Sequence, residues 1–395
     1  MADERRDLHT DTRVVHEGEG QSAEAAPVTS PLYDATTFVF DSAAEIEAYN
    51  DGRSRRYLYS RYENPTVGAT ERKLAALEGA ERALLFSSGM AATATTIMGL
   101  VGAGDEVVCA AAIYGGTLRL LTDLLPRFGV SARFVEQLDA DAIVSAIGPR
   151  TRLVWWESPS NPTLRCVDIA AVARACRDRQ VVSIVDSTFA SPVNQRPTAL
   201  GAELVMHSAT KYLGGHHDLT AGALAGPAGL VAKVESARHL LGSVLAPASA
   251  HLLARSLKTL ALRVARQNAN ALAVAAFLER DPRVSRVHYP GLPSHPDHAV
   301  ARRQMDGFGG MVSFDLGGSY ERAAAFFDRL GVFRRAASLG GVESLCSLPV
   351  LTSQAGWTDE QLARAGVTRG LVRLSVGVEE VGDLIADLDQ ALGRS

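Results

Sequence analysis

Residues 181–211 decide the fold and read VVSIVDSTFASPVNQRPTALGAELVMHSATK. The apolar, β-branched run 181–185 and the shorter run 203–206 each predict a buried strand. Asp186 directly follows the first run, and Lys211 comes soon after the second, among small hydroxyl residues. Because ligands of open α/β sheets bind beyond the carboxyl ends of the strands, we expect these two side chains at one site.

The same pattern continues on the N-terminal side of this stretch. Three more apolar runs predict buried strands, at 83–86, 106–110 and 152–156. Amphipathic stretches between the runs predict helices at 68–78, 117–128 and 169–179. Strand and helix in alternation predict an α/β fold with a mostly parallel sheet covered on both faces.

Beyond this sheet the pattern changes. A helical stretch at 249–278 is followed by a strand at 311–316, a helix at 321–330, a strand at 371–376 and a helix at 380–392. We therefore predict a smaller C-terminal α/β domain over 251–395, after a large domain over 65–250. Residues 1–64 form an arm, since 11–64 is irregular, rich in proline and polar residues, and carries an aromatic cluster that needs a surface to lie on.

Composition excludes several classes of protein. The chain has 395 residues, 47% of them hydrophobic and 21% charged, as in an ordinary globular enzyme. The net charge is -4 and no cluster of lysine and arginine with interleaved aromatics appears, so we expect no nucleic-acid partner. No apolar run is long enough to span a membrane, and the first twenty residues lack the apolar core of a signal peptide, so we expect a cytoplasmic protein.

Metal and disulfide sites are not expected. The four cysteines are far apart without a C-x-x-C pair, which favours buried free thiols. The sequence His216-His217-Asp218 could hold a metal ion, but adjacent histidines point apart and no second pair lies at ligand spacing.

Lys211 and Asp186 together favour one cofactor. A lone lysine after a strand could be a solvated surface residue, but a neighbouring strand ends at a carboxylate. Pyridoxal 5'-phosphate (PLP) requires this pair, an amine for a Schiff base and an anion that keeps the pyridine nitrogen protonated. The segment 87–90 (SSGM) follows a strand and opens a helix, so its backbone N–H groups can hold a phosphate, although an ordinary helix cap would look the same.

Six motifs occur in order along the chain: YSR at 59–61 with NPT at 64–66, SGM at 88–90, YGGT at 114–117, SPSNP at 158–162, Asp186 with SATKY at 208–212, and SLGG at 338–341. In these motifs the chain resembles the PLP-dependent enzymes of cysteine and methionine metabolism, including cystathionine γ-synthase, cystathionine γ-lyase and methionine γ-lyase. The resemblance implies the fold-type I, aminotransferase-like architecture and a homotetramer built from two catalytic dimers.

The resemblance also implies roles for single residues. Lys211 would carry PLP as a Schiff base and move protons, Asp186 would pair with the pyridinium nitrogen, and Tyr114 would stack on the ring and act as acid and base. The phosphate would be bound by Ser208, Thr210, Gly89 and Met90, with Tyr59 and Arg61 reaching the phosphate of the neighbouring subunit. The substrate carboxylate would be held by Arg373 with help from Asn161 and Ser338.

The substrate is indicated by departures from the family pattern. Enzymes that act on cystathionine carry a glutamate before SLGG and often an acidic residue before YSR, where this chain has Ala337 and Leu58. Methionine γ-lyases usually carry cysteine at the position of Gly116, and Arg119 is similar to the cystathionine enzymes. We expect a PLP-dependent γ-lyase that acts on L-methionine. Cystathionine γ-lyase, γ-replacement on an O-acylhomoserine, and a non-catalytic homologue are the alternatives.

Overall fold

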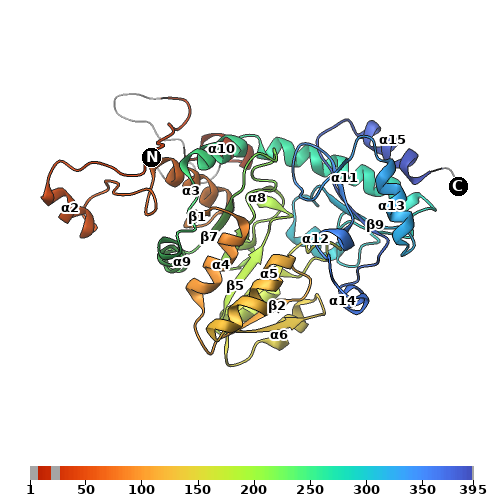
Figure 1. The fold of residues 1–395 in the computed structure, drawn as a ribbon, viewed down its shortest axis with the longest axis horizontal. Coiled ribbons are helices and arrows are strands. Elements are labelled where there is room, and N and C mark those ends of the chain that lie inside the picture. The colour runs from red at the N-terminus through yellow and green to blue at the C-terminus, as the bar shows by residue number, and fades with distance from the viewer. Residues whose placement is uncertain (1–7, 19–26, 394–395) are drawn as a thin grey trace.

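The computed structural model describes residues 8–18 and 27–393. Figure 1 shows two α/β bodies joined by a long helix, with an arm that extends away from the larger body. Each body is built on its own sheet, here called the large sheet and the small sheet.

The large sheet has seven strands in the order β1-β7-β6-β5-β4-β2-β3. Their bounds are β1 Arg82–Phe86, β2 Glu106–Ala110, β3 Ser131–Val135, β4 Thr151–Glu157, β5 Val182–Asp186, β6 Leu204–His207 and β7 Gly222–Gly226. The pairs β2–β3, β2–β4, β4–β5 and β5–β6 are parallel, which confirms the predicted fold class. Only β7 runs antiparallel to its neighbours, β1 and β6.

The sequence analysis missed β7 because its residues, GALAG, include no β-branched or aromatic side chain. The small residues are required by packing. A Cβ atom on Gly222 would lie 2.1 Å from the carbonyl oxygen of Ser88, so a larger residue would keep the strand away from the start of the helix at Gly89–Leu100.

Helices cover both faces of the large sheet. Their bounds are α3 Pro65–Glu78, α4 Gly89–Leu100, α5 Gly115–Arg119, α6 Ala140–Ala146, α7 Ile169–Asp178, α8 Ser191–Asn194 and α9 Ala228–Leu241. Alternate residues of β1 enter different hydrophobic cores, with Leu84 and Phe86 on one side and Ala83 and Leu85 on the other. The sheet is therefore buried on both faces, as expected for parallel strands.

Two predicted helices are divided in the structure. The helix expected at 117–128 is α5 followed by a π turn and a 3-10 turn, because Pro126 has no N–H to continue it. The helix expected at 249–278 is α10 Pro247–Leu257 and α11 Leu260–Arg280. At this break the Arg263 guanidinium donates to the carbonyl oxygens of Ser256 at 3.0 Å and Tyr212 at 2.8 Å. One carbonyl group that a continuous helix would bind, that of Ser256, thus accepts from a side chain, and the same guanidinium ties the break to the loop at Tyr212.

The small sheet has the order β10-β11-β12-β9-β8. The bounds of its strands and helices are β8 Arg286–His288, β9 Met311–Asp315, β10 Arg334–Arg335, β11 Leu345–Ser347, β12 Leu371–Ser375, α12 His298–Gln304, α13 Tyr320–Arg329, α14 Asp359–Arg364 and α15 Val381–Leu392. The first part of α11 packs in a core of the large sheet through Leu260 and Val264, and its second part packs in the core of the small sheet through Ala271 and Leu278. This helix therefore fixes the two sheets relative to each other.

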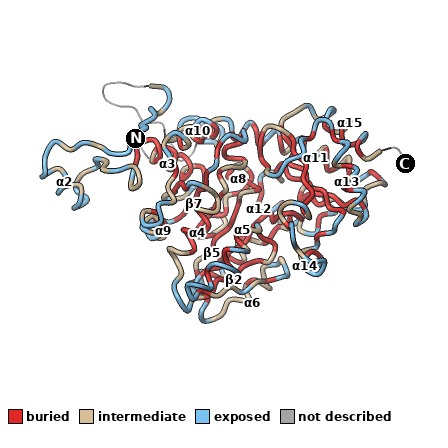
Figure 2. Tube along the Cα trace, viewed as in Figure 1, coloured by how far each residue is buried: buried red, intermediate tan, exposed pale blue. Residues whose placement is uncertain are grey.

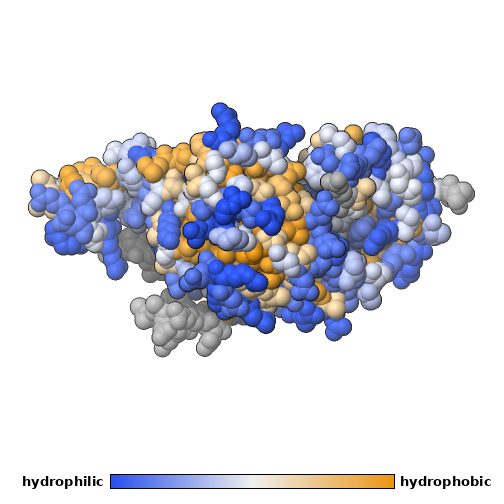
Figure 3. Space-filling view, turned by 90° about the horizontal axis from the view of Figure 1, so that it is seen from below, coloured by the Kyte–Doolittle hydropathy of each residue, from blue (hydrophilic) through white to orange (hydrophobic). Residues whose placement is uncertain are grey.

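The arm, residues 27–64, contains one short helix, α2 Ala43–Asn50, and a bridge between Thr37 and Tyr59. Figure 2 shows it as mostly exposed, in contrast to the buried strands. Large apolar side chains on it face solvent, with Val28 92% and Val39 82% exposed. Figure 3 shows hydrophobic residues on the arm and over the middle of the face seen from below.

Ahead of the arm, α1 Thr10–His16 packs against α3 and buries Val14. The rest of the predicted segment 1–64, residues 1–7 and 19–26, lies outside the described residues. Within the described ranges, none of the helices has the length and apolar character that crossing a membrane requires.

Candidate active site

A cavity of about 670 Å³ lies where the carboxyl ends of the parallel strands meet the small sheet. The predicted residues that line it are Gly89, Met90, Tyr114, Asn161, Asp186, Ser208, Thr210, Lys211, Ser338 and Arg373. They follow β1, β2, β4, β5 and β6 or come from the small sheet and the loop before β11. Residues that are far apart in the sequence thus meet beyond the carboxyl ends of the strands, where ligands of open α/β sheets bind.

Lys211 is largely buried, so it is not a solvated surface lysine. Its Nζ lies 2.9 Å from the hydroxyl oxygen of Ser338. Burial lowers the pKa of Lys211 to about 8, and the positive charge of Arg373 acts in the same direction. A sizeable fraction of this amine is therefore neutral near pH 8, the form that reacts with an aldehyde.

Asp186 is the last residue of β5 and is buried. It accepts a hydrogen bond from the backbone N–H of Thr188 at 3.0 Å. Burial raises the pKa of Asp186, while hydrogen bonds from Thr188 and the nearby His207 lower it. These contacts oppose the rise in pKa without cancelling it, and a protonated ring nitrogen facing Asp186 would favour the carboxylate form.

The start of α4 forms the predicted anion cradle. The hydroxyl of Ser88 caps the helix by accepting from the N–H of Ala91 at 3.0 Å. A Cβ atom on Gly89 would lie 2.8 Å from the hydroxyl oxygen of Ser208, so only glycine allows the two segments to lie this close. The Thr210 hydroxyl donates to the Ala221 carbonyl at 3.1 Å and accepts from the Ala221 N–H at 2.9 Å, which joins this loop to β7.

Arg373 is buried in the central part of the small sheet. It donates a hydrogen bond to the side-chain oxygen of Asn161 at 2.9 Å. Burial lowers the pKa of Arg373 to about 10, so it remains a cation at neutral pH. Ser338, predicted beside Arg373, instead contacts Lys211, and it has a left-handed backbone with φ of 100°.

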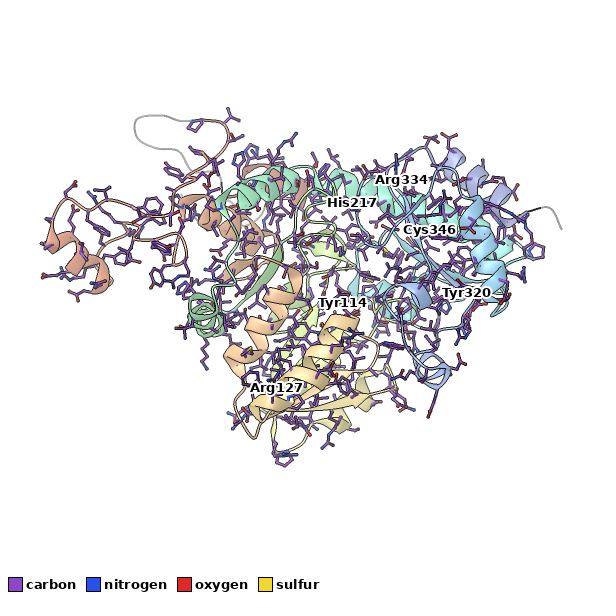
Figure 4. The ribbon with its side chains drawn as sticks, in the orientation of Figure 1. Tyr114, Arg127, His217, Tyr320, Arg334 and Cys346 are labelled. Carbon is purple, nitrogen blue, oxygen red and sulfur yellow. The ribbon has the colours of Figure 1, made fainter. Side chains whose placement is uncertain are left out.

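Tyr114 lies between the two bodies, as Figure 4 shows, and its side chain is half exposed. A Cβ atom on Gly116 would lie 2.6 Å from the Tyr114 ring and 2.8 Å from the sulfur of Met90. A larger residue at Gly116 would therefore displace the ring of Tyr114.

Tyr59 and Arg61 lie outside the cavity of their own chain. Arg61 donates to the carbonyl oxygen of His239 at 3.0 Å and lies 4.5 Å from the centre of the Tyr62 ring. Leu58 belongs to the same arm, where its carbonyl accepts from the N–H of Phe38 at 3.1 Å. Their contribution to a second subunit remains a prediction.

The sequence analysis did not single out Glu157, which lines the cavity and is buried. It ends β4 and pairs in register with Asp186 at the end of β5. The signal that pointed to Asp186, a polar residue after an apolar run, is also present at Glu157 and could have found it.

These residues fit PLP. A partly neutral lysine, a buried carboxylate and a helix N-terminus face one cavity, as the Schiff base, ring nitrogen and phosphate of that cofactor require. A model of the Cys/Met metabolism PLP-dependent enzyme family matches residues 11–393. The chain belongs to this family.

Relatives of known name and structure agree with this membership. The chain is 42% identical to L-methionine gamma-lyase of Pseudomonas putida, over 97% of each protein. It is 41% identical to cystathionine gamma-synthase 1, chloroplastic, of Nicotiana tabacum, over 98% of this chain and 72% of that protein. The structure of metB from Corynebacterium glutamicum superposes with a TM-score of 0.92 at 38% identity, over 98% of this chain and 99% of that one.

The comparisons confirm the predicted family, the fold-type I architecture and PLP as the cofactor. They also confirm the predicted enzyme class, a PLP-dependent carbon–sulfur lyase. The relatives divide between methionine and cystathionine enzymes at similar identity, so they do not select the substrate.

Proposed function

We propose that this enzyme is a γ-lyase of L-methionine, which converts methionine and water into methanethiol, 2-oxobutanoate and ammonia. One observation carries the proposal. Among the described residues that line the cavity, the charged side chains are Glu157, Asp186, Lys211 and Arg373. Lys211, Asp186 and Arg373 have roles at the cofactor or the substrate carboxylate, and Glu157 accepts from the backbone N–H groups of Tyr114 and Asn161. The wall near Ala337 and Leu339 has no charge to pair with a distal ammonium, so it favours an apolar thioether.

The residues divide the work as follows. PLP, when bound, would withdraw electrons from the substrate and so make the protons on its amine-bearing carbon, and then those on the next carbon, acidic. Lys211 Nζ would take the α-proton, give it back at a second position of the cofactor-bound substrate and then, neutral again, take a β-proton, for which a pKa of about 8 is well matched. Tyr114 Oη gives a proton to the departing sulfur.

The substrate carboxylate is held by the guanidinium of Arg373, which Asn161 orients through their 2.9 Å hydrogen bond. Because Arg373 comes from the small sheet and Asn161 from the large one, the clamp spans both bodies. Asp186 faces the ring nitrogen of the cofactor and keeps its charge positive.

A second copy of the chain completes the phosphate site in this proposal. The described lining residues near Gly89 and Ser208 offer hydroxyl and N–H groups, while the lysine and the arginine have other tasks. We infer that the partner subunit's Arg61 and the partner's Tyr59 supply the missing contacts, in a homotetramer located in the cytoplasm. Sedimentation should then give about four times the chain mass of 41.9 kDa.

Cystathionine is the second candidate substrate, because a hollow lined by charged side chains adjoins the cavity. The cavity adjoins a hollow of about 750 Å³, with which it shares Ala337 and Ser338. This hollow is lined by charged or titratable side chains, including Arg334, His217 and Glu343, of which the first two are labelled in Figure 4. A substrate with a charged distal half could extend into it, as could an O-acylhomoserine.

The deciding experiment measures 2-oxobutanoate release by the PLP-loaded enzyme from L-methionine and from L-cystathionine. We expect a higher kcat/KM for methionine. Release from cystathionine alone would select the second candidate. Release from neither, with product formed from O-acetylhomoserine and a thiol, would select γ-replacement. As a matched variant, Ala337→Glu should lower kcat/KM for methionine by about tenfold or more, because it places a charge in the apolar wall.

A further inference from the structure

Glu157 has a position that the proposed reaction does not yet use. It is 6% exposed and ends β4 at the wall of the cavity. Its Oε1 accepts a hydrogen bond from the backbone N–H of Tyr114 at 2.6 Å. Its Oε2 accepts a second hydrogen bond, from the backbone N–H of Asn161, at a nitrogen–oxygen distance of 3.4 Å. Both oxygens of one buried carboxylate are therefore bound to residues of the site.

These two contacts join separate parts of the site. Tyr114 stands at the start of α5, after β2, and Asn161 lies in the loop after β4. The side chain of Asn161 in turn accepts from Arg373, which lies on β12 of the small sheet. A chain of contacts thus runs from Tyr114 through Glu157 and Asn161 to the arginine.

Because Asp186 lies beside Glu157, packing alone does not explain why a glutamate occupies this position. Glu157 and Asp186 are register partners on adjacent strands, and both are buried. Burial, and then the charge of Asp186, raise the pKa of Glu157 well above its ordinary value. A second buried carboxyl beside Asp186 is unfavourable, so a core that served only packing would carry an apolar residue here.

We propose that Glu157 is a positioning residue, which holds the backbone at Tyr114 and at Asn161 so that the phenol and the arginine clamp keep a fixed separation across the cavity. This rests on the proposed function for the roles of Tyr114 and Arg373. The physical basis is that the two oxygens of one carboxyl group each accept an N–H group, one from the start of α5 and one from the loop after β4, which an amide side chain cannot do at both ends.

Glu157→Gln tests the proposal because it preserves shape. The amide oxygen can still accept one N–H, but the amide nitrogen faces the other N–H as a second donor, so one contact is lost. We expect kcat/KM for the best sulfur amino acid to fall by about tenfold to a hundredfold, with kcat lowered through Tyr114 and KM raised through Asn161. Glu157→Asp, which keeps the charge but is shorter, should show the same rise in KM.

Glu106→Gln is the matched control. Glu106 is also a buried glutamate of the large sheet, 6% exposed, but it begins β2 and so lies at the opposite edge. It accepts from the Thr151 hydroxyl at 3.1 Å and from Arg133 at 3.3 Å. Its replacement should lower the urea midpoint of unfolding while kcat and KM stay those of the wild type.

A binding measurement separates this proposal from the proposed function. The probe is 4-(methylsulfanyl)butanoate, which is methionine without its amino group, and its Kd is read from the absorbance of bound PLP. We expect the Kd of the probe to rise by about tenfold in Glu157→Gln and to stay unchanged in Glu106→Gln. This result needs no turnover, so it stands even if the wild type does not act on methionine. Wild-type Kd, kcat and KM in either folded Glu157 variant would overturn the proposal.

Discussion

The strand-end edge of the large sheet and the arm at 27–64 both carry predicted site residues, but they are built differently. At the edge, Asp186 and Arg373 are buried, Lys211 is half-buried, and all three are hydrogen-bonded within one chain. On the arm, Tyr59 is exposed, and Arg61 contacts His239 of α9 and the neighbouring Tyr62. The residues at the edge have partners within their own chain, whereas we propose that Tyr59 and Arg61 of the arm act in a second subunit.

The strands at the edge bury much more apolar surface than the arm does, and this explains the difference between the two regions. The strands are covered on both faces, so the edge is supported by the largest cores of the protein. The helix α2 has eight residues and none of them is buried. An isolated helix of that length is marginal in water, and apolar side chains such as Val39 remain exposed on the arm. We infer that the arm gains its stability from a second copy of the chain.

The most severe test of the edge is Lys211→Ala. We expect it to abolish the Schiff-base absorbance of the PLP-treated protein and to lower turnover by about a thousandfold or more, because no other amine lines the cavity among the described residues. Absorbance spectra and 2-oxobutanoate assays measure both effects. A Lys211→Ala protein that retained activity would refute the assignment of the site.

A pair of valines compares the stability of the two regions. Val154 in β4 is fully buried, whereas Val39 on the arm is 82% exposed. Val154→Ala should reduce the free energy of unfolding by about 1.5–3 kcal/mol, while Val39→Ala should change it by less than about 0.5 kcal/mol. Urea unfolding of the dilute protein gives both values. Equal losses in the two variants would show that the arm is as well packed as the sheet.

Arg61→Ala tests whether the arm serves a second subunit. We expect the Kd for PLP to rise by about tenfold, the effect of losing a charge-assisted hydrogen bond. Arg56→Ala, which removes an exposed arm arginine paired with Asp41, is the control and should leave the Kd unchanged. Mixed with Lys211→Ala protein under subunit exchange, Arg61→Ala should regain activity. Exchange without recovery would mean that the site is not shared.

The smallest expected effect is the change with pH in the rate at which the apoprotein captures PLP. Because burial lowers the pKa of Lys211 to about 8, its neutral fraction should rise from about a tenth at pH 7 to a half at pH 8. The rate at which the apoprotein captures added PLP should therefore rise about fivefold over this interval and level off above pH 9. Stopped-flow absorbance records the rate, with Nα-acetyl-lysine as the reference amine. A protein rate that kept rising to pH 10 would show an unperturbed lysine.

The prediction from sequence was most successful where local pattern and function coincide. One apolar run is followed by Asp186 and another by Lys211, and this pattern predicted that both side chains share one site. Both line the cavity. It failed at β7, whose small residues are chosen by the approach of Ser88 rather than by strand propensity. It also merged α10 and α11, because the break depends on Arg263 and its carbonyl partners.

The sequence by itself determined the alternation of strands and helices, the family, and the residues that follow each strand, since these depend on local periodicity and on short motifs. The tertiary structure is needed to show that Glu157 accepts from Tyr114 and Asn161, that Asn161 contacts Arg373, and that Tyr59 and Arg61 are not among the described residues that line the cavity. The physical reason is distance along the chain. The contact of Tyr114 with Glu157 spans 43 positions. The contact of Asn161 with Arg373 spans 212 positions, and it forms only when the two sheets have packed around α11.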